Sequence, residues 1–417
     1  MPYRGPERPR LRPVEIVPVE AEGGVNFALS DPQHVAAHPV VVSTGAVLVL
    51  QLLDGEHTLR DVQASIFRAT GQLFPMVQIE SLVEALDDQL FLDGPQFQAA
   101  YRAMREEFLS RRTRPCVLAG ASYPADPREL REFLDGLFSE PEGPGLPRHG
   151  SGPTDLKALI APHIDLRRGG NCFAHAYKSL AERSDAEVFV ILGIAHYGDG
   201  KPYTLTEKDF ETPLGVLPTE KAMVARLREL APPEVLGDEY GHRNEHSIEF
   251  QAVLLRYLYP DRSDLSILPI LCGSLYESLI ENRPPIERPD VRGFVEALRR
   301  VIEESGKRTC IISAVDLAHV GKRFGDRQAP DERLLRWVER EDRAMLDSVA
   351  ALDSDAFFRS LQKDHDRRHV CGYPAIYTML ALFDGEGSPS KGTLVRYEQS
   401  PEEETQSAVT FSSMIFT

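Results

Sequence analysis

Long apolar runs are missing from this 417-residue sequence: none approaches the roughly 20 residues that a helix needs to cross a bilayer. Basic residues are also fewer than acidic ones, with 47 lysines and arginines against 64 aspartates and glutamates. The formal net charge of −17 at pH 7 argues against nucleic acid and anionic membrane as partners. Five cysteines are too few for a disulfide framework in a chain of this length. The N-terminal stretch MPYRGPERPRLRPVE lacks the apolar segment of a secretory signal. We therefore expect a cytoplasmic protein with reduced cysteines.

Hydrophobic residues make up 42% of the chain, which suffices for a large core and for two domains. Residues 1–39 are expected to form an N-terminal arm, disordered at its start, because the first 15 residues are basic and proline-rich. A charged helical stretch that ends in a proline near residue 115 suggests a boundary. We expect a small domain with its linker helix in residues 40–112, and the main domain in residues 113–417.

The small domain has the pattern of three short helices and a β wing. Thr58 can cap a helix, with Asp61 three residues later, and the stretch LFLDG (90–94) is expected to be a short strand and turn. This pattern is typical of a winged helix. DNA binding is nevertheless disfavoured, because residues 54–93 carry eight acidic residues and only two arginines. A structural or dimerising cap is the alternative.

The main domain alternates apolar strand patterns with helical ones. The expected strands are LKALIAPHI, EVFVILGIAHY, LSILPILCG, TCIISAVDLAHV, TLVRYEQ and AVTFSSMIF. Helical patterns lie between them, for example NCFAHAYKSLAER and EHSIEFQAVLLRYL. This alternation predicts an α/β sheet that is covered by helices on both faces. Ligands of such sheets bind outside the carboxyl ends of the strands.

Polar residues follow three of the expected strands directly. His163 ends the first, His196 the second, and Asp316 with His319 the fourth. Two further candidates stand at the starts of helices. His246 is one, with Asn244 as a plausible cap and Glu249 on the same helical face. Cys371 is the other, where the helix dipole favours a thiolate. Convergent imidazoles and a thiolate suit a borderline transition metal, but spacing alone does not choose the ligands.

Seven motifs resemble those of the Memo family in the same order, across roughly residues 117–417. They are APHIDLRRGGNCFAHAYKSL, VFVILGIAHYG, NEHSIEFQAVLL, ILPILCG, SAVDLAHVG, VCGYPAIYTML and the late YEQS…SAVTF. Bacterial and archaeal members of this family are called AmmeMemoRadiSam system protein B. The resemblance implies a fold similar to that of the LigB-type class III extradiol dioxygenases, which are non-haem iron enzymes.

By motif, the resemblance implies that His163, His196 and Cys371 bind a metal ion. His246 is expected to act as a general acid or base, with Asp316, His319 and Glu249 in the surrounding pocket. The chain departs from the family at Asp165, Arg167 and Arg168, which follow the first histidine, and at Tyr197, where the family often has a second histidine. The changes at Asp165, Arg167 and Arg168 are expected to alter the rim of the pocket and to favour an anionic or peptide ligand.

The small domain resembles the PqqD-like domains, which bind peptides beside radical-SAM enzymes; LLDGEHTLRDVQASIF carries most of the likeness. A radical-SAM protein or its peptide substrate is therefore the expected partner. The peptide is expected to add as a strand at the FLDG wing or at the extended HPVVVS (38–43).

The fold favours Fe(II) as the metal, whereas a thiolate ligand leaves copper and zinc open. His369, two residues before Cys371, is an alternative ligand. Two classes of function remain: a non-haem, dioxygenase-like redox enzyme, or a non-catalytic component that holds a metal and presents a peptide or partner. A hydrolytic zinc enzyme is a third, with Glu249 or Asp316 as its carboxylate.

Overall fold

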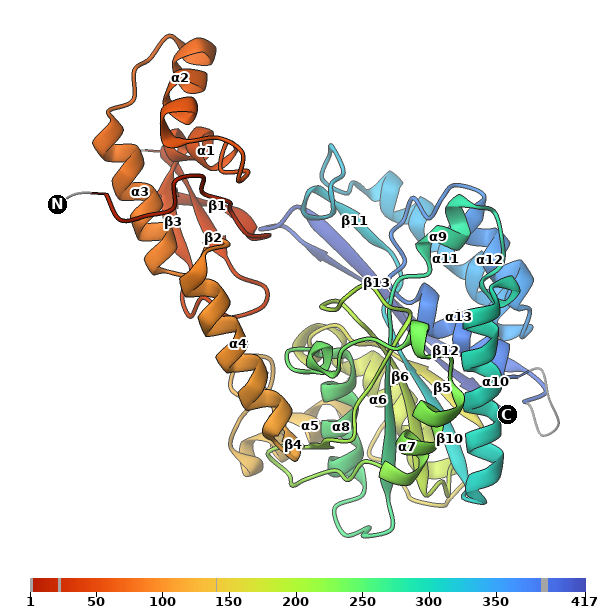
Figure 1. The fold of residues 1–417 in the computed structure, drawn as a ribbon. Coiled ribbons are helices and arrows are strands. Elements are labelled where there is room, and N and C mark those ends of the chain that lie inside the picture. The colour runs from red at the N-terminus through yellow and green to blue at the C-terminus, as the bar shows by residue number, and fades with distance from the viewer. Residues whose placement is uncertain (1–2, 22–23, 140, 384–388) are drawn as a thin grey trace. The chain divides into compact units, whose positions relative to one another are not determined.

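Residues 3–21, 24–139, 141–383 and 389–417 are described by the computed structural model (Figure 1). The chain divides into two units, residues 1–110 and residues 111–417. Within the described residues, no helix has the length and apolar character needed to cross a bilayer.

The first unit combines a three-stranded antiparallel sheet with four helices. The sheet has the order β1 (Glu15–Ala21), β2 (Gly24–Ser30), β3 (Val40–Ser43). The helices follow it in sequence as α1 (Thr44–Leu50), α2 (Leu59–Thr70), α3 (Met76–Asp88) and α4 (Pro95–Ser110). The expected cap is present, because the Thr58 side chain and that of Asp61 form a capping box at the start of α2.

The expectation of an N-terminal arm that begins in disorder is wrong for most of residues 3–39. This segment supplies two strands, and Leu29 has no exposed surface. Arg12 is buried as well, and its guanidinium pairs with Asp31 at 3.0 Å. The charged residues that suggested an arm therefore include an internal ion pair, which sequence composition does not reveal.

The β wing that we expected at residues 90–94 is not formed there. Residues 90–94 form no named strand. Instead, Leu92 pairs with Leu11 in an isolated bridge, and the backbone N–H of Arg12 donates to the carbonyl of Phe91 at 3.0 Å. The strands of this unit thus precede its helices, and the chain's own N-terminal segment lies along the FLDG stretch. Of the two edges expected to accept a peptide, only β3 remains at the edge of the sheet.

The second unit is built on an eight-stranded mixed sheet. Its order is β11 (His319–Gly321), β13 (Ser407–Phe416), β5 (Ala158–Ala161), β10 (Thr309–Ala314), β6 (Val188–Ile194), β9 (Ser266–Cys272), β7 (Tyr203–Leu205), with β12 (Gly392–Glu402) paired to β13. The four central strands, β5, β10, β6 and β9, run parallel to one another. A separate pair joins β4 (Thr113–Arg114) to β8 (Asp209–Phe210).

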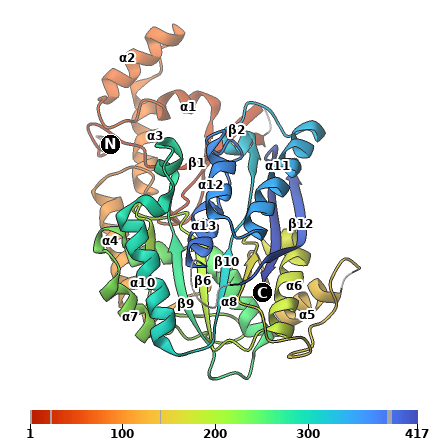
Figure 2. The same cartoon turned by 90° about the vertical axis from the view of Figure 1, so that its right-hand side faces the viewer.

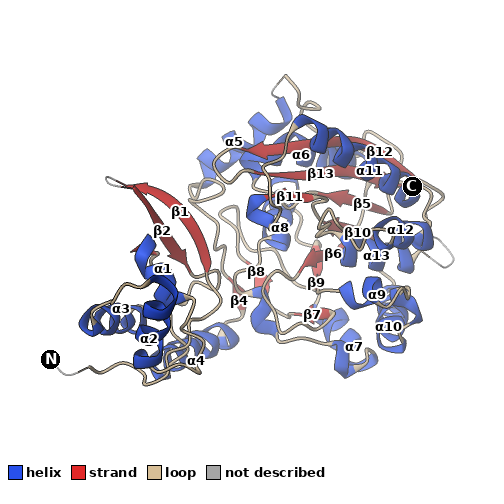
Figure 3. Cartoon of the chain, turned by 90° about the horizontal axis from the view of Figure 1, so that it is seen from above, coloured by secondary structure: helices blue, strands red, loops and turns tan. Residues whose placement is uncertain are grey.

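Helices cover both faces of this sheet (Figures 2 and 3). One face packs against α5 (Pro127–Ser139), α6 (Leu166–Arg183) and α8 (Ser247–Leu258). The other packs against α7 (Lys221–Leu230), α9 (Tyr276–Ile280), α10 (Pro289–Ser305), α11 (Glu332–Ala350), α12 (Ser354–Gln362) and α13 (Tyr373–Leu382). The predicted α/β class is confirmed. β5, β6 and β9 are fully buried because each lies between two helical layers, which explains their unbroken apolar runs.

Candidate metal centre

Three neighbouring parallel strands each place a polar residue two positions past their last residue. β5 ends at Ala161 and is followed by His163, and β6 ends at Ile194 and is followed by His196. Between them, β10 ends at Ala314 and is followed by Asp316. Because parallel strands end at the same edge, this common offset brings the three residues to one place, as the sequence predicted.

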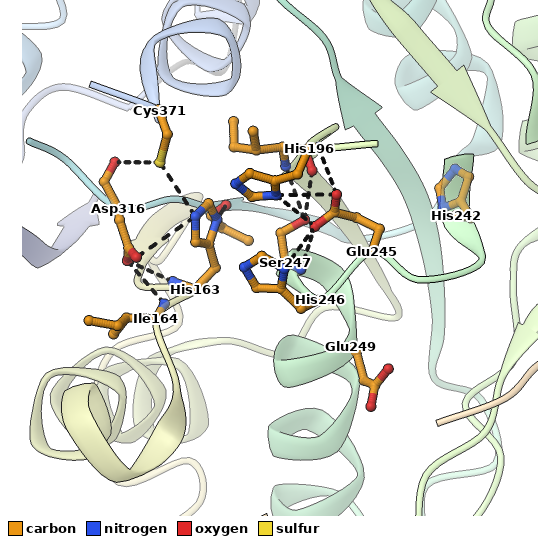
Figure 4. A network of polar contacts seen from close by, with 12 residues as sticks. His163, Ile164, His196, His242, Glu245, His246, Ser247, Glu249, Asp316 and Cys371 are labelled. Carbon is orange, nitrogen blue, oxygen red and sulfur yellow. Dashed lines mark hydrogen bonds and ion pairs between the residues drawn. The ribbon is translucent and has the colours of Figure 1, made fainter. Parts of the chain in front are cut away.

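His163, His196 and His246 form a compact cluster at this edge (Figure 4). Their ring centroids lie 5.0 Å apart for His163 and His196, 5.1 Å for His163 and His246, and 4.6 Å for His196 and His246. One potential ligand atom from each lies within 4.8 Å of the others. The side chain of His163 is only 2% exposed, whereas those of His196 and His246 are 28% and 29% exposed. The cluster is therefore open to solvent on one side.

The Nδ1 atom of each histidine faces an acceptor, through a hydrogen bond at His163 and His196 and an ion-pair contact at His246. Nδ1 of His163 donates to the carbonyl of Ala314 at 2.9 Å. Nδ1 of His196 lies 3.0 Å from Oε1 of Glu245, and Nδ1 of His246 lies 3.4 Å from the same oxygen. This leaves Nε2 of each ring for a metal ion, with the orienting acceptors that metal-bound histidines commonly have.

Burial keeps two of these rings neutral, the form in which imidazole binds a metal. It lowers the pKa of His163 well below the ordinary value and that of His246 to about 4. Burial would also lower the pKa of His196, but the charge and hydrogen bond of Glu245 outweigh it, so the pKa of His196 is raised. A bound cation would displace that proton, and the donor set therefore fits a divalent transition metal.

Cys371 lies on the other side of His163. Its Sγ is 3.4 Å from Nε2 of His163 and 3.6 Å from the carbonyl oxygen of Asp316. We expected the start of α13 to favour the thiolate, but burial and then the charge of Asp316 raise the pKa of the Cys371 thiol well above its ordinary value. The thiol therefore stays protonated unless a cation replaces the proton.

Asp316 adjoins the cluster from the side of β10. Its Oδ1 accepts the backbone N–H groups of His163 at 3.0 Å and Ile164 at 3.1 Å, and its Oδ2 lies 3.8 Å from Nε2 of His163. Burial raises the pKa of Asp316 to about 7 despite these hydrogen bonds. The carboxyl group thus lies where we expected it, next to the candidate ligands.

Glu245 was missed by the sequence analysis. Its carboxylate is 1% exposed and accepts the backbone N–H of His196 at 2.8 Å and that of Ser247 at 3.0 Å, besides the ring of His196. Burial would raise its pKa, but the positive charge of His196 and these donors hold the pKa well below its usual range. An acidic residue directly before His246 was the available signal. Asn244, the expected cap, is not the cap residue of α8, which is His246 itself.

Glu249 is not part of the pocket, which corrects our expectation. Its carboxylate points away from the three rings (Figure 4) and forms a fully buried ion pair with Arg114. It also accepts the hydroxyl of Tyr123 at 2.5 Å and the N–H groups of Val117 and Leu118. A carboxylate with these partners cannot serve as the base of a zinc hydrolase, so Asp316 is the remaining candidate for that role.

The expected rim residues after His163 have structural partners. Asp165 caps α6 by accepting the N–H of Arg167 at 2.8 Å, and the side chain of Arg167 donates to the carbonyl of Ala121. Arg168 binds Ser400 through two hydrogen bonds of 3.0 Å. These contacts give none of the three a direct interaction with the histidine cluster.

The remaining candidates lie around the centre. Tyr197 is half-buried, with its ring centroid 6.4 Å from that of His196. Nδ1 of His319 lies 3.1 Å from the carbonyl of Leu317, and Nδ1 of His369 lies 3.2 Å from the carbonyl of His319. The exposed His369 does not join the three-histidine group.

Comparison with known proteins shows that the sequence is similar to one protein family. A model described as "Memo-like protein" matches residues 114–415. A MEMO1 family protein of Aquifex aeolicus is 27% identical over 409 residues, which cover 98% of this chain and 100% of that protein. A MEMO1 family protein of Thermus thermophilus is 28% identical, with 86% and 98% coverage. An uncharacterized Escherichia coli K12 protein of known structure has 16% identity and a TM-score of 0.37 over 63% of this chain and 100% of its own, too low to define a shared fold.

Proposed function

The chain belongs to the Memo family, and from this premise we propose that it binds one transition metal ion through His163, His196 and Cys371 and acts as a redox component of the AmmeMemoRadiSam system. The observation that carries the proposal is the arrangement of these three side chains. Nδ1 of His163 and Nδ1 of His196 are each held by an acceptor, and Sγ of Cys371 lies 3.4 Å from Nε2 of His163.

Fe(II) is the proposed metal, with copper or zinc as alternatives. Two imidazoles and one thiolate would hold the ion, and Fe(II) would supply redox chemistry for O₂ or a small organic substrate. The side of the cluster formed by His196 and His246 is the exposed one, so we place substrate entry there.

His246 is proposed as the residue that exchanges a proton with the substrate. Its Nδ1 faces Glu245, which orients the ring and stabilises the protonated form, while the ring keeps part of its surface open to solvent. Asp316 accepts the consecutive backbone N–H groups of His163 and Ile164 and thereby fixes the first ligand. An alternative ligand set, His163 with His196 and His246, is favoured by the mutual distances of the three rings.

Metal content decides between these sets. We expect His163→Ala, His196→Ala and Cys371→Ala, each purified without oxygen, to lose most bound iron while their circular dichroism stays unchanged. His246→Gln should retain the iron. His175→Ala is a suitable control, since His175 lies on α6 and contacts the carbonyl of Glu142. Full iron occupancy in Cys371→Ala together with loss in His246→Gln would replace the proposed set by the three-histidine set. Exposure of the loaded protein to O₂, followed by absorption spectroscopy, then tests for redox activity.

A second candidate function is a non-catalytic component that holds the metal and presents a peptide. The observation in its favour is β3, which pairs only with β2 among the described strands and exposes 58% of Val41. An extended peptide can add to such an edge through main-chain hydrogen bonds. We propose the radical-SAM protein or its peptide substrate as the ligand of this edge. Loaded protein that shows no spectral change with O₂ but binds this partner would favour the second function.

A further inference from the structure

Arg114 is a fully buried arginine that contacts the loop before α8. Its Nε donates to the backbone carbonyl of His242 at 3.1 Å, and its Nη2 donates to that of Glu245 at 2.6 Å. Its Nη1 donates to the carbonyl of Pro115 at 2.9 Å and to the carboxylate of Glu249. One guanidinium thus joins both ends of the 242–245 loop to the first turn of α8.

The geometry of these contacts requires an arginine. Four N–H groups on three nitrogen atoms point in fixed directions toward four acceptors. A lysine ammonium carries three donors on a single nitrogen and cannot reach acceptors spread over the same plane. A lysine at this position would keep a positive charge near Glu249 but would lose the hydrogen bond to at least one of the backbone carbonyls.

The loop held in this way carries the carboxylate that orients two of the three histidines. Glu245 contacts the rings of His196 and His246, and its own carbonyl is one of the two that Arg114 binds. On the other side of the loop, Nε2 of the buried His242 donates to the carbonyl of Thr204 at 3.0 Å. The loop is therefore held by the side chain of Arg114 and, through its own His242 side chain, by the backbone of Thr204.

We propose that Arg114 is a positioning residue for the metal centre: by holding the carbonyls of His242 and Glu245, it sets the orientation of Glu245 and His246 toward His196. The expected effect of Arg114 on metal affinity rests on the proposed metal-binding function. The positioning of the loop itself is a property of the metal-free protein. Arg114 touches none of the candidate ligand side chains, so its effect is transmitted through the loop.

Three full-length variants test this role. Arg114→Lys keeps a cation opposite Glu249 and removes the forked contacts to the loop. Arg114→Met combined with Glu249→Gln removes both buried charges together, which avoids leaving one of them unpaired. Tyr123→Phe is the matched control, since it removes a donor from Glu249 but leaves every contact of Arg114 in place.

The first measurement is amide hydrogen exchange of residues 239–247 in metal-free protein, after circular dichroism has shown that each variant is folded. We expect exchange about 10-fold faster in both Arg114 variants and unchanged in Tyr123→Phe, because the loop loses charged hydrogen bonds. The second is Co²⁺ binding, with affinity about 10–100-fold lower and an altered visible spectrum in the Arg114 variants only.

The proposal would be overturned if residues 239–247 exchanged their amide hydrogens at the wild-type rate in both Arg114 variants. It would also be overturned if exchange in Tyr123→Phe were as fast as in the Arg114 variants, because general loosening of the buried network would then explain the effect. Wild-type protein that binds no Co²⁺ would overturn the proposed function instead, and hydrogen exchange would still decide the role of Arg114.

Discussion

Glu245 holds both the backbone and the ring of His196. One carboxylate oxygen accepts the His196 N–H at 2.8 Å, and the other accepts its Nδ1 at 3.0 Å. The carboxylate is almost fully buried, whereas the imidazole keeps 28% of its surface exposed. The pair therefore fixes the histidine that ends β6 while leaving its outer nitrogen accessible.

Replacing Glu245 by glutamine should weaken metal binding by about 10–100-fold, because an amide orients the ring less strongly and carries no charge to stabilise a bound cation. The pKa of His196 should fall, since Glu245 is the group that raises it. Isothermal titration with Co²⁺ and NMR titration of the metal-free protein measure the two effects. Glu220→Gln is the matched control, because Glu220 binds Ser266 and Lys307 instead. Equal Co²⁺ affinity in the two variants would contradict this role for Glu245.

The thiol of Cys371 should react slowly in metal-free protein at neutral pH, because burial raises its pKa. Cys116, which is also half-buried, is the internal comparison, because burial raises the pKa of its thiol less than that of Cys371. We expect iodoacetamide to modify Cys371 more slowly than Cys116, as measured by mass spectrometry of the two peptides. Added metal should change the rate at Cys371 and leave Cys116 unaffected. If metal changed neither rate, Cys371 would not be a ligand.

His242 should make the free energy of unfolding fall in acid. Burial lowers its pKa to about 4, compared with about 6.5 in an unfolded chain. Between these values the unfolded chain binds a proton that the folded protein does not, so stability decreases as pH falls. The difference corresponds to about 3 kcal/mol below pH 4.

His242→Gln, which can still donate to Thr204, should therefore lose less stability between about pH 7 and pH 4 than wild-type protein. Urea unfolding of metal-free samples at several pH values measures the difference. The other buried histidines still titrate in the variant, so part of the slope should remain. Parallel stability curves for the two proteins would show that His242 is not the titrating group.

Residues 1–110 should fold alone, because they have a separate core that includes Leu29, Val62 and Val83. The isolated unit should bind a basic peptide more weakly as salt rises and show no affinity for duplex DNA. Val41→Lys should reduce peptide binding by placing a like charge on β3. Val77→Lys, at a similarly exposed position on α3, should not. Tight DNA binding, or an unfolded fragment, would contradict this view of the unit.

The sequence determined the strands and the residues at their ends. Unbroken apolar runs mark β5 and β6, a largely apolar run marks β10, and a polar residue at the same offset marks the exit of each strand. The family motifs likewise pointed to His163, His196, His246 and Cys371, and the structure brings these four side chains together. Strands and the residues at their ends can be predicted from the sequence because both depend on the pattern of neighbouring residues.

Only the tertiary structure decided which side chains face the centre. Glu249 follows His246 by three residues and was expected beside it, but Arg114, 135 positions away, pairs with it on the far side. Arg12 looked like part of a disordered arm, but its ion pair with Asp31 is buried. In both cases the desolvation of a charge forces it to find a partner, and that partner is chosen by the packing of distant segments, which the periodicity of a single stretch of sequence does not encode.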